Sequence, residues 1–132
     1  TFAFGPPLIL NGQLCADVDQ DRVGRINPRA GLGLVEPGHF VAIVVDGRIA
    51  GYSHGVVLSE FAKMFQDEGC VMAYNLDGGA SATLVFMGEY INLRSAKHYR
   101  TVPDQLLWGY SELVPTVDDP YVYSGIVGTK DD

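Results

Sequence analysis

The segment LSEFAKMFQDEGCVMAYNLDGG, residues 58–79, decides the fold that the sequence predicts. Over residues 58–68 its apolar side chains recur at positions i, i+3, i+4 and i+7, which is the spacing of one helix face. Gly69 is typical of the residue that ends a helix. The largely apolar run that follows, residues 70–76, predicts a buried strand. The segment therefore predicts a helix that packs on a sheet.

Short apolar runs separated by turn residues lie on both sides of this segment. Asn-Gly at 11–12 and Asp-Gly at 46–47 indicate two-residue hairpin turns. Further strands are expected over residues 31–35, 40–45, 48–52, 83–86, 90–93 and 105–110. We therefore predict an α+β fold, a mixed β-sheet built from hairpins with one main helix, in a domain over residues 1–110. Residues 111–132 are predicted to form a peripheral C-terminal tail.

The chain is acidic, with a net charge of −7 over 132 residues and a pI of about 4.7. Because it has no run of basic residues, nucleic acid is not an expected partner. The longest apolar run, residues 40–45, is far too short for a membrane span, and no signal peptide is visible. Cys15 and Cys70 are interpreted as reduced, buried thiols, although their pairing is left open.

The segment NLDGGAS, residues 75–81, is the strongest candidate site. Asn75, Asp77 and Ser81 follow a buried strand, and the two glycines between them let a backbone approach a ligand closely. A carboxylate at the end of a buried strand is costly unless it has partners or a task. The alternative is a tight turn in which Asp77 accepts backbone hydrogen bonds.

Three arginines lie beside predicted turns, at Arg29, Arg48 and Arg100. Each by itself is typical of a solvated surface residue. In a chain of net negative charge, however, an anionic substrate needs a local cluster of arginines. If the fold brings these three together, they would form an anion clamp.

A serine-hydrolase interpretation rests on GYSHG, residues 51–55, which matches the pattern G-x-S-x-G around Ser53. Asp77 and His98 could complete a catalytic triad. Two valines separate this motif from the predicted helix, however, and the hydrolase sheet needs a much longer chain. This interpretation is therefore the less favoured alternative.

No cofactor is expected from the motifs. The sequence lacks H-E-x-x-H, C-x-x-C and a Gly-rich phosphate loop. The acidic stretch DVDQD, residues 17–21, begins like an EF-hand loop, but Arg22 and Pro28 stand where that loop needs Gly and Glu. A divalent cation is possible but is not indicated by the ligand spacing, so no metal ligand is predicted.

The order of the motifs resembles the phosphodiester glycosidase family. That family includes the enzyme that uncovers mannose 6-phosphate on lysosomal proteins and many bacterial proteins associated with exopolysaccharide biosynthesis. The resemblance covers about residues 4–110, and the order of the motifs is specific although each motif alone is weak. The motifs are FGPPL at 4–8, NG at 11–12, PR at 28–29, VDGR at 45–48, Ser53 with Gly55, the helix at 58–68, NLDGG at 75–79 with Ser81, and RTV at 100–102.

The resemblance implies hydrolysis of a sugar-1-phosphodiester bond, which removes a sugar from a phosphate-linked glycan. Such chemistry needs a carboxylate at the anomeric carbon, and the resemblance assigns this role to Asp77. It also needs donors for the phosphate, and Arg29 and Arg48 are the expected ligands because an arginine fork matches phosphate oxygens. The expected substrate-binding residues are Asn75, Gly78, Gly79, Ser81, Ser53, Asp46 and Arg100.

Three departures from the family pattern bear on these expectations. Ala30 stands where the family has Thr, and residues 80–83 read Ala-Ser-Ala-Thr where it has a third Gly and two hydroxyl residues. Nothing here corresponds to the family's N-terminal half. The resemblance thus implies an extracytoplasmic protein whose missing half comes from a second chain or fragment, or a homo-oligomer. The alternative function is a non-catalytic carbohydrate-binding domain of the same fold.

Overall fold

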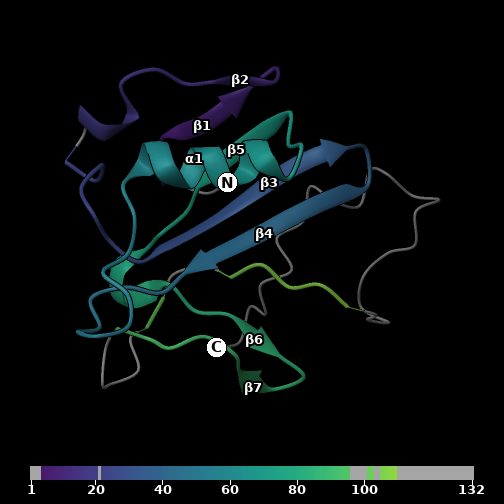
Figure 1. Ribbon diagram of the computed structural model, residues 1–132. Helices are drawn as coiled ribbons and strands as arrows, with labels where there is room; N and C mark the ends of the chain where they lie inside the picture. Colours follow the sequence, from purple (N-terminus) through teal and green to yellow (C-terminus); the bar gives the residue numbers. More distant parts are fainter. Residues whose placement is uncertain (1–3, 21, 96–100, 103–104, 110–132) are drawn as a thin grey trace.

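The computed structural model describes residues 4–20, 22–95, 101–102 and 105–109, and its main body is a five-stranded sheet with one helix on one face (Figure 1). The strand order is β2-β1-β5-β3-β4. The five strands are β1 (Pro7–Leu10), β2 (Gln13–Leu14), β3 (Arg29–Glu36), β4 (His39–Val45) and β5 (Met72–Asn75). The helix, α1 (Leu58–Asp67), confirms the expected main helix.

Every strand pairing in the described part of the chain is antiparallel, so the expectation of a mixed sheet is wrong. The reason lies in the connection through α1. Strand β3 pairs antiparallel with both β4 and β5, so the chain that leaves β4 and crosses through α1 returns in the same direction along β5. Because β3 lies between those two strands, they do not pair with each other.

Three of the expected strand regions differ in detail. Residues 48–52 form turns with one isolated bridge between Ile49 and Ser53, because Arg48 (φ 57°) and Gly51 (φ 76°) reverse the chain. Residues 105–109 form no strand. The hairpin around Met87-Gly88 is short, with β6 (Val85–Phe86) and β7 (Glu89–Tyr90). The expected tail, residues 111–132, lies outside the described residues.

Two of the turns carry positive φ at both central residues. Asn11 and Gly12 have φ of 50° and 76°, and they join β1 to β2. Met87 and Gly88, with φ of 52° and 84°, join β6 to β7. This conformation matches the twist of the flanking strands, which is why Asn-Gly indicates a hairpin.

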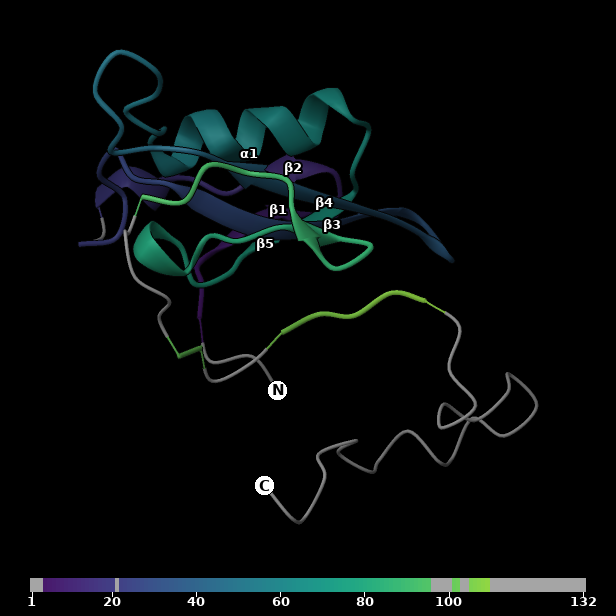
Figure 2. The same cartoon turned by 90° about the horizontal axis from the view of Figure 1, so that it is seen from below.

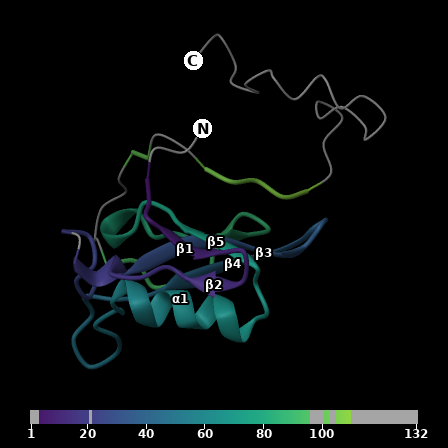
Figure 3. The ribbon, with the colours of Figure 1, turned by 90° about the horizontal axis from the view of Figure 1, so that it is seen from above.

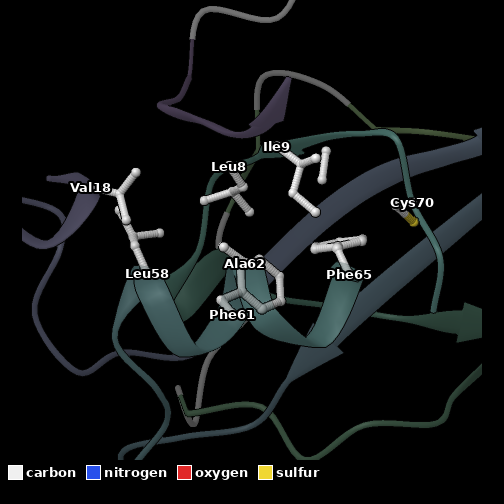
Figure 4. Packing of buried hydrophobic residues seen from close by; sticks show 9 residues of the cluster. Leu8, Ile9, Val18, Leu58, Phe61, Ala62, Phe65 and Cys70 are labelled. Carbon is white, nitrogen blue, oxygen red and sulfur yellow. The ribbon is translucent and has the colours of Figure 1, made fainter. Parts of the chain in front are cut away.

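The core lies between α1 and the sheet face that it covers (Figure 4). Phe61 and Phe65 are fully buried and meet edge to face with ring centroids 5.1 Å apart. They lie directly on β3, since a Cβ added to Gly31 would be 2.8 Å from Phe61 Cε1. At Gly33 it would be 2.7 Å from Phe65 Cδ1. The buried cluster also contains Leu8, Ile9, Val18, Leu58, Ala62, Cys70 and Ala73.

A short helical turn, η1 (Val18–Gln20), fixes the beginning of α1. Asp19 Oδ1 accepts a hydrogen bond from the Ser59 backbone N–H at 2.9 Å, and Asp19 Oδ2 accepts one from the Ser59 hydroxyl. The bond from the Ser59 side chain is the main cause that lowers the pKa of Asp19. The acidic stretch at 17–21 therefore supplies a cap to a helix forty residues further along.

The opposite face of the sheet is not covered by α1 (Figures 2 and 3). Leu10, Phe40 and Met72 lie on or beside this face with 45%, 52% and 47% of their surfaces exposed. They line an apolar hollow of about 260 Å³ together with residues of β1, β3 and β5. Among the described residues, no helix has the length and apolar character that a membrane crossing requires.

Candidate active site

The expected site residues that the structure describes gather at the end of the sheet where β3 begins. Arg29 pairs with Val45, and Gly31 pairs with Asn75, so β3 begins where β4 and β5 end. The segments that leave β4 and β5 at this edge carry most of the residues that the sequence singled out. A helical turn, η2 (Gly79–Ser81), follows β5 here and is visible beside the end of β4 in Figure 1.

Asp77 and Ser81 line one cavity of about 620 Å³ on the side of the sheet away from α1. Within the described residues, the half-buried Asp77 carboxylate has no hydrogen-bond partner. The Ser81 hydroxyl is buried and likewise has no partner in the described part of the chain. A buried hydroxyl without a partner is uncommon in proteins and indicates a place for water or a ligand.

The two glycines between Asp77 and Ser81 hold the turn against β3 and its neighbours. The Gly79 N–H donates to the Pro28 carbonyl at 2.9 Å, and a Cβ added to Gly78 would be 2.5 Å from that same oxygen. Gly79 has φ of 60°, and a Cβ there would be 3.1 Å from Arg48 Nη2. The Gly79 amide is therefore already engaged within the protein, and the close approach that the sequence predicted is to the chain's own backbone.

Arg48 lies against this turn, as its closeness to Gly79 shows. Its Nη2 donates to Asn27 Oδ1 at 2.6 Å, and its side chain is exposed. The described residues that line the cavity do not include Arg48. Its guanidinium therefore borders the Gly78–Gly79 turn from outside the cavity.

Arg29 is buried, with 3% of its surface exposed. Its Nε donates to the Val56 carbonyl at 3.1 Å, and its Nη2 donates to the carbonyls of Gly24, at 3.2 Å, and Arg25. Burial lowers its pKa, and Asp19 partly opposes that shift. A bidentate fork uses two neighbouring nitrogens, and here Nε and Nη2 are engaged with backbone oxygens. In this structure Arg29 therefore fastens loops together, and the fork expected for phosphate is not available.

Asn75 faces away from the cavity. It lies two residues after Ala73 on the face that α1 covers, because side chains alternate along a strand. Its Nδ2 donates to the Gly5 carbonyl at 2.8 Å, while its Oδ1 is buried without a partner among the described residues. The structure therefore brings Asp77 and Ser81 to one cavity and places Asn75 on the other side of the sheet.

Asp46 joins two loops rather than opening onto the cavity. Its Oδ1 accepts from Asn92 Nδ2 at 3.0 Å, and its Oδ2 accepts from the Leu93 N–H at 3.1 Å and the Tyr52 hydroxyl at 3.2 Å. The bond to Asp46 raises the pKa of Tyr52. Asn92 Oδ1 in turn accepts from the Leu84 N–H at 2.7 Å. This network holds the segment after β7 against the turn after β4.

Ser53 takes part in the same turn. Its hydroxyl donates to the Asp46 carbonyl at 2.7 Å and accepts from the Gly55 N–H at 3.2 Å. No base among the described residues takes the hydroxyl proton, so the described part of the chain gives the serine-hydrolase alternative no support. His98 and Arg100, which that alternative and the anion clamp would use, lie outside the described residues.

Arg94 is the site residue that sequence reasoning missed. It lines the same cavity as Asp77 and Ser81, and its guanidinium carbon is 4.2 Å from the centre of the Tyr90 ring. Ser95, the next residue, donates its hydroxyl to the Gly79 carbonyl at 3.4 Å. Arg94 follows a short hairpin in irregular chain, where no periodic pattern marks it. Its one sequence signal is its place directly after the strand expected over residues 90–93.

The described residues contain no group of three or more His, Cys, Asp or Glu side chains placed to hold a metal ion. Asp19 of the acidic stretch instead caps α1. Cys15 and Cys70 are both free thiols, but only Cys70 is buried, so the expected burial of Cys15 is wrong. Burial, followed by the charge of Glu68, raises the pKa of Cys70.

The fold and the cavity define an α+β domain with a carboxylate, a hydroxyl and a guanidinium at one end of an antiparallel sheet. The family model for phosphodiester glycosidase matches residues 1–108, which is most of the chain. The chain therefore belongs to the phosphodiester glycosidase family.

Several proteins are similar to this chain. The SPbeta prophage-derived uncharacterized protein YomE of Bacillus subtilis (strain 168) is 37% identical over 86 residues, which are 65% of this chain and 13% of YomE. The catalytic domain of zebrafish N-acetylglucosamine-1-phosphodiester alpha-N-acetylglucosaminidase, auto-inhibited by its pro-peptide, aligns with TM-score 0.57 and 27% identity. That match covers 67% of this chain and 33% of the zebrafish chain.

Two bacterial proteins of known structure are also similar to this chain. A hypothetical protein from Synechocystis aligns with TM-score 0.57 and 26% identity over 69% of this chain and 18% of its own. A protein described as exported, from Burkholderia pseudomallei K96243, aligns with TM-score 0.52 and 30% identity over 55% of this chain and 14% of its own. The chain thus spans a third or less of each of these relatives.

Proposed function

We propose that this chain carries part of the active site of a glycosidase that hydrolyses sugar-1-phosphodiesters. The single observation that supports this most is the pairing of Asp77 and Ser81 in one cavity, each without a partner among the described residues. A carboxylate and a hydroxyl placed in this way can contact a ligand. Membership of the phosphodiester glycosidase family supplies the reaction class.

In the proposed reaction, water replaces the phosphodiester oxygen at the anomeric carbon. The bond between that carbon and the oxygen breaks, its electrons leave with the phosphate ester, and the sugar keeps the new hydroxyl. Asp77 faces the anomeric carbon, where it stabilises an oxocarbenium-like state, attacks it, or takes a proton from water. Ser81 donates to a substrate oxygen. No cofactor is required by this scheme.

The roles of the remaining predicted residues follow from their contacts. We propose that Arg48, Gly78 and Gly79 shape the turn that aims Asp77, and that Asp46 and Ser53 hold the neighbouring loop. Asn75 and Arg29 have supporting roles on the buried side. Asn75 bonds to Gly5, just before β1, and Arg29 bonds to the carbonyls of Gly24 and Val56 in two separate loops. Arg100 remains a proposed substrate ligand.

We propose that further polypeptide completes the site, as a second chain, a fragment or another copy of this one. The zebrafish catalytic domain is about three times as long as the part that this chain matches, and the sheet face away from α1 leaves large apolar residues exposed. Light scattering of purified material tests this: a stable monomer of 14.3 kDa without exposed apolar surface in dye-binding assays would contradict it. By analogy with the exported relative, we place the protein outside the cytoplasm.

The activity is tested with N-acetylglucosamine 1-(methyl phosphate) and glucose 1-(methyl phosphate), using this chain with any polypeptide that co-purifies. We expect Asp77→Asn to lower kcat about a thousandfold while substrate affinity changes little. The conservative change Thr83→Ser, on the same cavity wall, serves as the control. NMR of the product anomer then separates attack by Asp77, which retains configuration, from activation of water, which inverts it. Full activity of Asp77→Asn would show that the carboxylate has another role.

A carbohydrate-binding domain without catalysis is the second candidate. It is favoured by the aromatic residues Phe86 and Trp108, which line the cavity and can stack on a sugar ring. Sugar binding by the wild type, with no release of sugar from either phosphodiester, would favour this candidate over the enzyme.

A further inference from the structure

We propose that Arg94 forms an anion-binding site for the phosphate group of the substrate, and that Asp46 is the residue that positions it. This inference rests on the proposed function for the identity of the ligand. It adds a phosphate ligand to those that the sequence predicted at Arg29 and Arg48.

The first argument is the place of Arg94 in the cavity. It shares the cavity wall with Asp77 and Ser81, whereas neither Arg29 nor Arg48 lines that cavity. Most of the other lining residues are apolar, among them Leu76, Leu84 and Leu106. An arginine in such surroundings interacts more strongly with an anion than one in open water, because the local dielectric constant is lower.

The second argument is the way in which Tyr90 holds the guanidinium. The guanidinium carbon is 4.2 Å from the ring centre, which is a cation–π contact with the face of the ring. The N–H groups of arginine lie in the guanidinium plane. A guanidinium that lies over a ring in this way is compatible with hydrogen bonds from its edge to phosphate oxygens. The contact with Tyr90 also reduces the rotamer freedom of Arg94 that binding would otherwise remove.

The third argument is that the chain on both sides of Arg94 is fastened to the two turns of the site. On one side, Asp46 accepts hydrogen bonds from the Asn92 side chain and the Leu93 backbone. On the other side, Ser95 donates to the carbonyl of Gly79, which belongs to the turn after Asp77. Arg94 is thus anchored relative to the carboxylate that the proposed reaction uses. Asp46 acts through this anchoring and does not itself touch the ligand.

The experiment measures binding by isothermal titration calorimetry, with inorganic phosphate, glucose 1-phosphate and methyl α-glucoside as probes. We expect Arg94→Gln to weaken binding of both phosphate probes about tenfold or more, and to leave the neutral sugar unaffected. Arg94→Lys keeps the positive charge but lacks the bidentate guanidinium, so its affinity for phosphate should lie between those of the wild type and Arg94→Gln. Arg22→Gln removes an exposed arginine that lies outside the cavity lining, and it should change nothing. Thermal melts confirm that each variant is folded.

The role of Asp46 is tested by a double-mutant cycle. Asp46→Asn should weaken phosphate binding when Arg94 is present. It should cause no further loss of affinity in the Arg94→Gln background, because Asp46 acts through Arg94. An equal further loss in that background would overturn the positioning role. If Arg94→Gln binds both phosphate probes as the wild type does, or if the wild type binds neither, the anion site is overturned.

These outcomes are distinguishable from failure of the proposed function. If phosphate binding depends on Arg94 and no phosphodiester is hydrolysed, the anion site stands and the enzymatic proposal fails. If the wild type hydrolyses a sugar phosphodiester and Arg94→Gln has the same kcat and KM, the enzymatic proposal stands and the anion site fails.

Discussion

The two faces of the central sheet differ in packing: α1 covers one, and the other is largely exposed. Under α1, β3 presents Gly31 and Gly33, and the rings of Phe61 and Phe65 lie directly on its backbone. On the other face, Phe40 is half exposed and a cavity contains Asp77 and Arg94. The first face is close-packed and supplies stability. The second leaves apolar surface and charged groups accessible, as a site for substrate or further polypeptide requires.

The largest expected effect compares one phenylalanine from each face. Phe61→Ala should lower the free energy of unfolding by about 3–5 kcal/mol, because it leaves a cavity in the core. Phe40→Ala should lower it by about 1 kcal/mol or less, since half of that side chain is already in water. Urea unfolding followed by circular dichroism measures both. Equal losses would mean that the open face is covered in solution, which would support a docked polypeptide.

Arg29 and Arg48 give the next largest contrast. Arg29→Lys should cost about 2–4 kcal/mol, because one ammonium cannot satisfy the three carbonyls that the buried guanidinium reaches. Arg48→Lys, at an exposed side chain, should cost less than about 1 kcal/mol. The same urea titration compares them. A stable Arg29→Lys variant that has lost phosphate binding would return Arg29 to the ligand role that the sequence predicted.

Enlarging one small residue on each face sharpens the comparison of packing. Gly33→Ala should cost about 1–3 kcal/mol, because the new Cβ would be 2.5 Å from Cys70 Sγ and 2.7 Å from Phe65 Cδ1, so that α1 would have to shift. Ala42→Val, which enlarges an exposed residue on the cavity side, should change stability by about 0.5 kcal/mol or less. Differential scanning calorimetry reports both changes. Similar melting temperatures for the two variants would contradict the close packing of α1 on β3.

The smallest expected effect concerns the cap on α1. Asp19→Ala should cost about 1 kcal/mol at neutral pH, because it removes the acceptor for Ser59. The pKa of Asp19 is lowered from its ordinary value of 3.8. Its contribution is therefore complete above that value and is lost as the pH falls through the lower folded-state pKa. Unfolding titrations at pH 7 and at pH 2 should show the difference between wild type and Asp19→Ala shrinking in acid. A difference that is constant with pH would exclude the ionised cap.

The sequence predicted well where structure depends on neighbouring residues. The helix over residues 58–67 follows from an apolar face within three turns of chain, and the turn at Asn11-Gly12 follows from two residues that tolerate positive φ. The strand after Gly69 follows from its continuous apolar character, which fits a strand with partners on both sides. The strand predicted over residues 48–52 is wrong, because Arg48 takes a positive φ that its residue type does not indicate.

The candidate site was predicted in part. Asp77 and Ser81 were identified from their place at the end of a buried strand, and they share a cavity. The sequence places Asn75 beside them, but Asn75 still belongs to β5 and faces α1, whereas Asp77 follows after the strand has ended. Arg29 was expected to hold phosphate, but carbonyls 24, 25 and 56 surround it. No sequence pattern marks Arg94, because contacts between segments distant in the sequence hold it near Asp77: Ser95 bonds to Gly79, and Asn92 bonds to Asp46.

The sequence by itself determined the helix, most of the strands, the position of the carboxylate and the resemblance to the phosphodiester glycosidases. All of these depend on residue types at short spacings along the chain. Only the tertiary structure decided that β3 separates β4 from β5, that Arg29 is a buried support, and that Arg94 lies in the cavity with Asp77. These properties depend on which segments meet in space, because an arginine's partners come from distant loops and its sequence neighbours do not reveal them.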